Sequence, residues 1–212
     1  MTMKSLFIVL EGIDKAGKST QAELLKNYFL THQQQAVISS EPTDGPIGKL
    51  IREAMQSKII AIKQKESFDE QMAYLFTADR HYHLFNDING VYKLINEDHT
   101  HVIATRYYFS SLAYNCDAQN EFIFVATLNQ RFPDPDVVFY IDIPLKIALS
   151  RLNNYSLREI YETEKKLRKV RHNYENIFKT YEGKMFKLDG TGSIEEIHRK
   201  ILTYLKETFS SF

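Results

Sequence analysis

Residues 10–20, LEGIDKAGKST, combine glycines, a lysine and hydroxyl side chains at a spacing that could hold a chain of phosphates. The segment from Gly12 to Ser19 fits the pattern G-x-x-x-x-G-K-[ST] at every position. Glycines at these places let backbone N–H groups converge on phosphate oxygens, and the N-terminus of a following helix adds partial positive charge. In such a loop Lys18 reaches the β- and γ-phosphates, and the Ser19 hydroxyl holds magnesium. The segment therefore predicts a site for ATP or GTP.

Three arginines and one aromatic ring follow other predicted strands. Arg52 lies about one turn into a helix that we expect to start near Ile47, and Arg106 directly follows a short apolar run. Phe76 and Arg80 are four residues apart, which places them on one face of a helix. An aromatic plane beside a guanidinium group suits a flat base with hydrogen-bonding edges. Each residue alone could be a core ring or a solvated charge, but their shared position after strands indicates a second binding site.

The elements that must position these residues are short apolar strands that alternate with helices. Strands are expected at Leu6–Leu10, Ala36–Ser40, His101–Thr105, Val137–Ile141 and Met185–Leu188. Helical spacing runs through 21–29 and 72–76, and Ser67 and Ser193, each with a Glu three residues later, are typical of capping boxes that open helices. Continuous apolar strands indicate a parallel sheet covered on both faces. We therefore expect a three-layer, doubly wound α/β fold of the P-loop nucleoside-triphosphate hydrolase type, with a five-stranded parallel sheet and ligands beyond the carboxyl ends of its strands.

The composition sets the broad class of the protein. With 212 residues, 43% of them hydrophobic and 25% charged, the chain resembles an ordinary globular protein, and we expect one domain over residues 1–212. Lys+Arg 27 balances Asp+Glu 27, so no overall charge favours nucleic acid or an anionic membrane. The single cysteine, Cys116, excludes an internal disulfide, and the first apolar run is too short for a signal peptide. We expect a cytoplasmic protein that binds neither nucleic acid nor membrane.

A switch GTPase also carries a phosphate loop, but it needs further motifs. The Asn-Lys-x-Asp motif that would read guanine is absent from the sequence. Asp87–Gly90 fits the Asp-x-x-Gly pattern, but we expect this stretch to be part of an amphipathic helix rather than the end of a strand. Motor ATPases usually need a longer chain. The favoured class is a small nucleotide kinase, in which a second pocket accepts the phosphate.

Seven segments in family order make the chain resemble the thymidylate kinases. They are LEGIDKAGKSTQ, EPTDGPIGKLIR, LFTADRHYH, TRYYFSSLAY, PDPDVVFYIDIPLKIALSR, KVRHNYENI and LDGTGSIEEIHRKI. The resemblance runs from Phe7 to about Ile201, nearly the whole chain. It implies an enzyme that transfers the γ-phosphoryl of MgATP to dTMP and gives dTDP for DNA precursor synthesis. The implied cofactor is Mg²⁺, and ATP is the implied phosphoryl donor.

The resemblance implies roles around the acceptor. Phe76 would stack on thymine, Arg80 would face the edge of the base, and Arg106 would hold the acceptor phosphate together with Arg52. Tyr114 would exclude ribonucleotides at the 2′ carbon. The residues expected to bind dTMP are Asp14 (at the sugar 3′-hydroxyl), Arg52, Phe76, Arg80, Arg106, Ser111 (on the methyl side of the base) and Tyr114.

It also implies roles around the donor. The residues expected at the ATP phosphates are Gly12, Ile13, Asp14, Lys15, Ala16, Gly17, Lys18, Ser19 and Thr20. Those expected to act in catalysis are Lys15, Lys18, Arg106 and Arg158. Arg158 belongs to a lid expected at about 153–162, although it could equally belong to the charged face of a helix that runs through REIYETEKKLRKVRHNYENIF.

The clearest departure from the family is Thr105, which stands where thymidylate kinases usually carry an Asp before the arginine. A hydroxyl can hydrogen-bond a magnesium-bound water but brings no negative charge. We expect Ser19 to contact the metal, with Glu11 as a candidate replacement acid and Asp14 and Glu162 as further ones. Lys15 could compensate by neutralising some of the phosphate charge. The sequence thus predicts an active kinase with a raised magnesium requirement.

Two other functions stay open at this stage. One is a kinase for another deoxynucleoside monophosphate, such as dUMP or dGMP. The other is a nucleotide-binding protein with weakened catalysis, because of Thr105. The resemblance also implies a homodimer, and the apolar stripe in Asn120–Phe132 could be its interface or simply part of the core.

Overall fold

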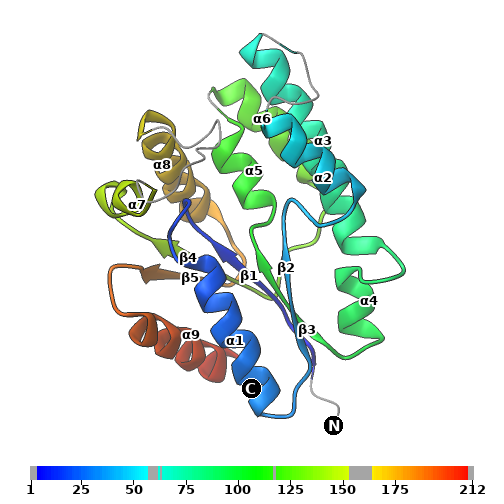
Figure 1. Ribbon diagram of the computed structural model, residues 1–212, viewed down its shortest axis with the longest axis vertical. Coiled ribbons are helices and arrows are strands. Elements are labelled where there is room, and N and C mark those ends of the chain that lie inside the picture. The colour runs from blue at the N-terminus through cyan, green and yellow to red at the C-terminus, as the bar shows by residue number, and fades with distance from the viewer. Residues whose placement is uncertain (1–3, 57–61, 63, 117, 153–163, 210–212) are drawn as a thin grey trace.

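A single sheet of five parallel strands forms the centre of the protein, as the sequence predicts (Figure 1). The computed structural model describes residues 4–56, 62, 64–116, 118–152 and 164–209. The strands are β1 (Phe7–Glu11), β2 (Ala36–Ser40), β3 (His101–Thr105), β4 (Val137–Asp142) and β5 (Met185–Asp189). Their order across the sheet is β2-β3-β1-β4-β5. Each observed strand lies within one residue of its expected bounds.

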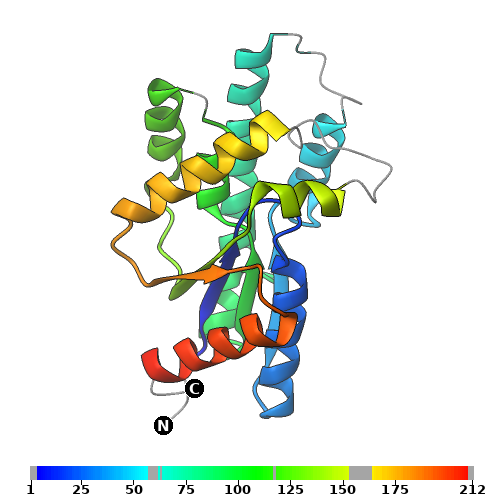
Figure 2. The same cartoon turned by 90° about the vertical axis from the view of Figure 1, so that its left-hand side faces the viewer.

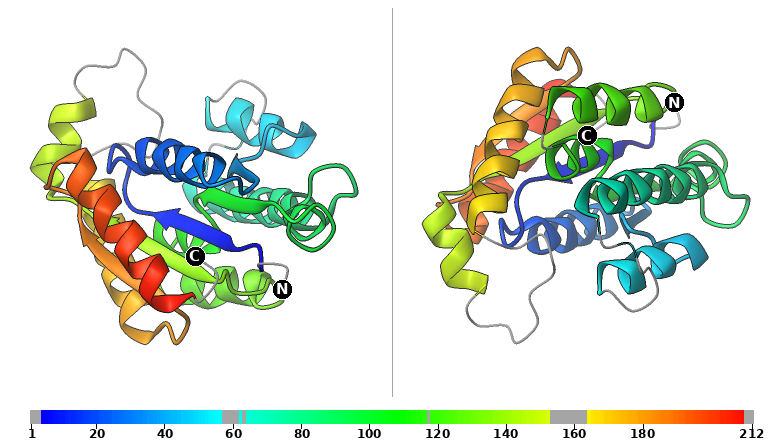
Figure 3. Two further views of the ribbon diagram at one scale, coloured as in Figure 1. Left: turned by 90° about the horizontal axis from the view of Figure 1, so that it is seen from below. Right: turned by 90° about the horizontal axis from the view of Figure 1, so that it is seen from above.

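Helices cover both faces of the sheet, which confirms the three-layer α/β arrangement (Figure 3). They are α1 (Lys18–Thr31), α2 (Pro46–Met55), α3 (Lys65–Phe85), α4 (Val91–Asn96), α5 (Tyr108–Tyr114), α6 (Gln119–Asn129), α7 (Leu145–Leu152), α8 (Glu164–Thr180) and α9 (Ile194–Thr208). Helices α1 and α9 pack together, as Figure 2 shows, and α5 packs against α8. None of the helices in the described part of the chain is both long and apolar enough to cross a membrane.

The central strands form the core because their side chains are apolar on both faces. All five residues of β1 are buried, and Val9 pairs with Ala104 on one side and with Val138 on the other. Such runs suit a parallel sheet that has helices on both sides. Since all strands are parallel, the loops after β1, β2 and β3 meet at one edge of the sheet, where ligands bind in this class of fold.

Of the two predicted capping boxes and the helix predicted at Asp87–Gly90, only one capping box is confirmed. Ser193 is the N-cap of α9, and its capping box with Glu196 is confirmed. The second expected capping box is wrong: α3 begins at Lys65, and Ser67 lies inside its first turn, where its hydroxyl donates to Gln64. The expectation of a helix at Asp87–Gly90 is also wrong. The side-chain oxygen of Asn86 accepts hydrogen bonds from the N–H groups of Ile88 and Asn89, which fixes a turn between α3 and α4.

Candidate active site

The loop between β1 and α1 has the backbone that a phosphate site requires. Gly12 has φ of 145°, and a Cβ there would lie 2.5 Å from the carbonyl oxygen of Ile141, so only glycine fits. Gly17 is left-handed as well and is the N-cap of α1. The loop opens onto a cavity of about 730 Å³. Its lining includes the loop residues Asp14, Lys15, Ala16, Gly17, Lys18, Ser19 and Thr20, whereas Gly12 and the buried Ile13, which are also expected at the phosphates, do not line it.

Lys18 is held by its own loop. Its Nζ donates to the carbonyl oxygens of Gly12 at 2.8 Å and of Ile13 at 2.9 Å. Burial, followed by the positive charge of Arg106, lowers the pKa of Lys18 to about 7. An anion bound beside Lys18 would raise this pKa again and keep the amine protonated. The surroundings of Lys18 therefore favour the binding of a strong anion.

Arg106 is the centre of a partly buried cluster at the end of β3. Its guanidinium forms an ion pair with Asp14 and donates to the hydroxyl of Tyr114 at 3.1 Å, while Tyr114 donates to Asp14 at 2.9 Å. The ring of Tyr114 lies 4.7 Å from the guanidinium carbon. Burial would raise the pKa of Asp14, but Arg106 and Lys18 outweigh it, so this pKa is lowered and the carboxyl is ionised. Arg106 has φ of 86°, an uncommon conformation that is typical of functional sites.

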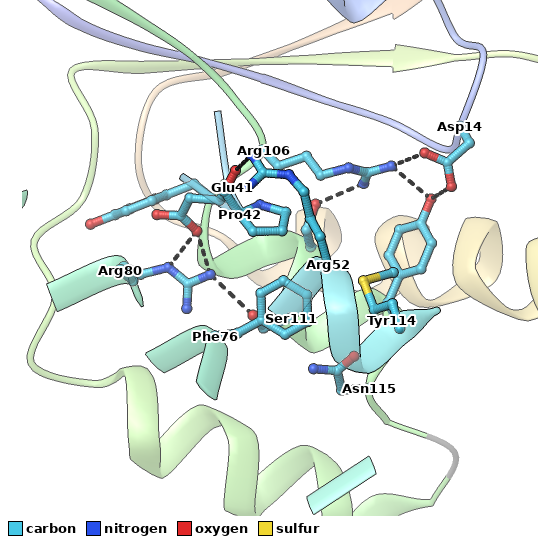
Figure 4. A pocket seen from close by; sticks show the side chains of 13 residues that line it. Asp14, Glu41, Pro42, Arg52, Phe76, Arg80, Arg106, Ser111, Tyr114 and Asn115 are labelled. Carbon is cyan, nitrogen blue, oxygen red and sulfur yellow. Dashed lines mark hydrogen bonds and ion pairs between the residues drawn. The ribbon is translucent and has the colours of Figure 1, made fainter. Parts of the chain in front are cut away.

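A second, smaller cavity of about 150 Å³ lies beside this cluster (Figure 4). It is lined by Asp14, Glu41, Pro42, Arg52, Met55, Phe76, Arg80, Arg106, Tyr107, Ser110, Ser111, Tyr114 and Asn115. All seven residues expected to bind the acceptor are therefore brought together. In Figure 4, the ring of Phe76 lies between Arg80 at one end of the cavity and Tyr114 at the other. Asp14, Glu41 and Arg106 line both cavities, so the two sites meet at these residues.

Arg80 is almost completely buried and is fixed by three partners. Its Nε donates to Glu41 at 2.9 Å, its Nη2 donates to Glu41 and to the Ser111 hydroxyl, and its Nη1 donates to Asn129. His83 contacts the other oxygen of Glu41 at 3.0 Å. Burial would raise the pKa of Glu41, but Arg80 outweighs it and the pKa is lowered. This carboxylate therefore holds the guanidinium in one orientation at the wall of the cavity.

Arg52 contacts the loop that follows β2. It donates to the carbonyl oxygens of Thr43 at 2.6 Å and Pro42 at 2.9 Å, and it pairs with Asp44. Gly48, on the same helix, leaves no room for a side chain, because a Cβ would lie 1.9 Å from the carbonyl oxygen of Thr43. This close approach of α2 to the loop sets the position of Arg52 on the cavity.

The residues considered for metal binding lie in different surroundings. Ser19 and Thr105 line the larger cavity. The carboxylate of Glu11 is fully buried and does not line that cavity; it accepts hydrogen bonds from the N–H of Tyr107 and the hydroxyls of Ser110 and Tyr174. Burial raises the pKa of Glu11. Across residues 4–209, apart from those outside the description, no group of three or more His, Cys, Asp or Glu side chains could hold a metal.

Some residues at the two cavities were not predicted from the sequence to have a role there. Arg151 on α7 donates to the carbonyl oxygen of Lys15 at 2.8 Å and lines the larger cavity. Glu41 directly follows β2, and this position at a strand end was an available signal. Asn115 and Asn129 lie near Arg80 only because α5 and α6 pack beside α3. Arg158 and the lid expected at 153–162 lie outside the described residues.

The parallel sheet, the phosphate loop and the adjoining second cavity define a protein of the P-loop nucleotide-kinase class. Comparison with known proteins agrees. Residues 10–201 match the family model described as thymidylate kinase. The chain is 35% identical over 205 residues to the "Probable thymidylate kinase" of Pyrococcus horikoshii, covering 96% of this chain and 97% of that protein. It is also 35% identical over 204 residues to the "Probable thymidylate kinase" of Thermococcus kodakarensis, covering 95% and 97%.

The chain belongs to the thymidylate kinase family. A solved structure of thymidylate kinase from Candida albicans has the same fold. It matches with a TM-score of 0.76 at 20% sequence identity, covering 98% of this chain and 93% of that one.

Proposed function

We propose that this protein is a thymidylate kinase that transfers the γ-phosphoryl of MgATP to dTMP, giving dTDP and ADP. The observation that carries the proposal is the shared border of the two cavities. One cavity has the phosphate loop, the other has an aromatic ring with a fixed guanidinium, and Asp14 and Arg106 line both. A phosphoryl acceptor in the smaller cavity would therefore face a triphosphate in the larger one. Both substrates are anionic, and Lys18 and Arg106 supply positive charge at that border.

The chemistry is a displacement at the γ-phosphorus. A phosphate oxygen of dTMP forms a bond to this phosphorus, the bond to the β–γ bridging oxygen breaks, and ADP leaves with the electron pair. Lys18 leaves the carbonyl groups of its loop and binds the β- and γ-phosphates. Arg106 holds the acceptor phosphate, oriented by Asp14 and Tyr114. The contribution of these residues is mostly position and charge neutralisation.

Magnesium fits this site as part of the ATP substrate. Ser19 and Thr105 line the larger cavity, where the Thr105 hydroxyl donates to the carbonyl oxygen of Ser39 at 3.4 Å, while Asp14 is paired with Arg106. A site with few protein ligands is normal for Mg²⁺, which keeps several waters and binds substrate phosphates. When bound, the metal neutralises charge on the phosphates. We propose that Lys15, which also lines this cavity, adds positive charge there.

The test is ADP release in a coupled assay with ATP, magnesium and a panel of monophosphates. We expect release with dTMP well above that with dUMP, dGMP and ribonucleotides. ADP release with dGMP alone would assign a different acceptor. Tight ATP binding without dTMP-dependent release would mean a nucleotide-binding protein rather than a kinase.

Thr105→Asp should lower the magnesium concentration needed for half-maximal rate several-fold. A carboxylate at the end of β3 would accept hydrogen bonds from magnesium-bound water more strongly than a hydroxyl does. The measurement is the rate as a function of magnesium at saturating nucleotides. Thr31→Asp, which adds the same charge at the far end of α1, serves as the control. An unchanged magnesium dependence in Thr105→Asp would show that this side chain does not act on the metal.

Tyr114→Phe should lower turnover about tenfold, because it removes the hydroxyl that joins Asp14 and Arg106. The ring stays in place, so preference for dTMP over ribo-UMP should not change. Tyr114→Ala removes the ring as well, and this preference should then relax. Kinetics on both acceptors with both variants distinguish a sugar-excluding ring from a residue that only supports Arg106.

We further propose one cytoplasmic kinase domain, with a lid at 153–162 that carries Arg158, and a homodimer. The dimer is supported by apolar side chains exposed on neighbouring helices: Tyr74 of α3 is 48% exposed and Ile123 of α6 is 58% exposed. An edge-to-face contact between the rings of Tyr74 and Phe124 joins these two helices, so their exposed side chains form one surface. Sedimentation that shows a stable monomer at micromolar concentration would contradict the dimer.

A further inference from the structure

The side-chain NH2 group of Asn115 (Nδ2) is buried and has no hydrogen-bond partner in the described part of the chain. Asn115 is the C-cap residue of α5, it lines the smaller cavity, and it is 5% exposed. Native proteins pair nearly all buried polar groups, and an unpaired one costs free energy. A ligand in the cavity that accepts a hydrogen bond would remove this cost.

The polar groups beside Asn115 indicate which atom of a ligand would accept its hydrogen bond. Ser111 lies one helical turn before Asn115 on α5, and Arg80 donates to its hydroxyl oxygen at 3.1 Å. Four of the five N–H groups of Arg80 donate hydrogen bonds to Glu41, Ser111 and Asn129, so one N–H on Nη1 remains to donate to a ligand. The Ser111 oxygen retains a second lone pair. The cavity therefore offers a donor, an acceptor and a second donor: Arg80, Ser111 and Asn115.

We propose that Asn115 is a base-reading residue, whose Nδ2 donates a hydrogen bond to the 2-keto oxygen of the acceptor's pyrimidine. The inference rests on the proposed function and names one more contact in the same site. Thymine presents O4, N3–H and O2 along one edge, in the order acceptor, donor, acceptor. This order is complementary to Arg80, Ser111 and Asn115. Along the corresponding edge cytosine presents donor, acceptor, acceptor, guanine presents acceptor, donor, donor, and adenine presents donor, acceptor, so none of these bases matches all three positions.

Asn115→Leu tests the proposal, because leucine has a similar shape and no polar atoms. The variant should unfold at a higher temperature than the wild type, since the unpaired amide is gone from the free protein. At the same time the Kd and KM for dTMP should rise about tenfold, while the KM for ATP stays the same. Loss of affinity together with a gain in stability is an outcome that a purely structural role of Asn115 would not give.

The atom on the base is identified with 2-thio-dTMP, in which sulfur, a weaker acceptor, replaces O2. The wild type should bind dTMP about tenfold more tightly than 2-thio-dTMP, and the ratio should fall to near one in Asn115→Leu and in Asn115→Ala. The analogue 4-thio-dTMP is altered at the oxygen assigned to Arg80. The ratio of its Kd to the Kd of dTMP should be the same in the wild type and in both variants.

Asn173→Ala is the matched control. Asn173 on α8 donates to the carbonyl oxygens of Ala113 at 2.9 Å and Cys116 at 3.1 Å, so it supports the same stretch of backbone without lining the cavity. This variant should lose stability and keep the 2-thio ratio of the wild type. If Asn115→Leu raises the Kd values of dTMP and 2-thio-dTMP equally, the inference is overturned while the kinase assignment stands. If the wild type binds dTMP without releasing ADP, the kinase assignment falls, and the Kd ratios, measured by isothermal titration calorimetry, still decide the role of Asn115.

Discussion

Lys18→Met should lower kcat about 100- to 1,000-fold, because it removes a positive charge at the point where negative charge develops during transfer. The fold should survive, since among the described residues the Nζ of Lys18 donates hydrogen bonds only to two carbonyl groups of its own loop. The measurement is ADP release at saturating ATP and dTMP, together with thermal unfolding. Binding of dTMP alone should change little.

The control for this variant is Lys26→Met. Lys26 lies on α1, two turns beyond the loop, and does not line either cavity. It should keep the wild-type rate. A Lys18→Met protein that is folded and turns over at more than a tenth of the wild-type rate would contradict the assignment of this lysine to the transferred phosphoryl group.

Glu41→Ala should lower the free energy of unfolding by about 3–5 kcal/mol, because it leaves the guanidinium of Arg80 buried without its carboxylate. Chemical denaturation measures this loss. The KM for dTMP should rise as well, since Arg80 loses the partner that fixes its orientation. The KM for ATP should change much less.

Glu41→Ala combined with Arg80→Leu separates the two effects. Removing both charges leaves no buried unpaired ion, so the double variant should recover much of the lost stability without recovering affinity for dTMP. Stability that stays as low as in Glu41→Ala would mean that the cavity left by Glu41, rather than the unpaired charge, causes the loss.

The parts that the sequence predicts well are those determined by local pattern. The strands were predictable because runs such as FIVLE and VVFYID are apolar at nearly every position, as buried parallel strands require. The phosphate loop was predictable because its glycines have fixed spacing. The capping box predicted at Ser67 was wrong because a serine followed by a glutamate three residues later is only a statistical preference of helix N-termini. Here the helix had already begun two residues earlier.

The contacts between distant elements could not be predicted in this way. Glu41 and Arg80 are separated by 39 residues, and their pairing depends on how α3 lies across the end of β2. Arg151 reaches the phosphate loop from 136 residues away, because α7 ends beside it. The sequence also does not show that Glu11 faces the hydroxyls of Ser110 and Tyr174. That direction is set by the register of β1 against its neighbours.

The order of strands in the sheet has a consequence for how the chain folds during synthesis. β1 is the first strand of this sheet to be synthesised, yet its two neighbours are β3 and β4, so it has no strand partner in the sheet until His101–Thr105 have been made. Parallel pairing over such a separation is slow, since a long loop must close before its contacts form. The nascent chain therefore carries an apolar segment with unpaired backbone groups while residues 12–105 are synthesised. Such a segment is a natural binding site for chaperones, and its aggregation is the expected failure of folding.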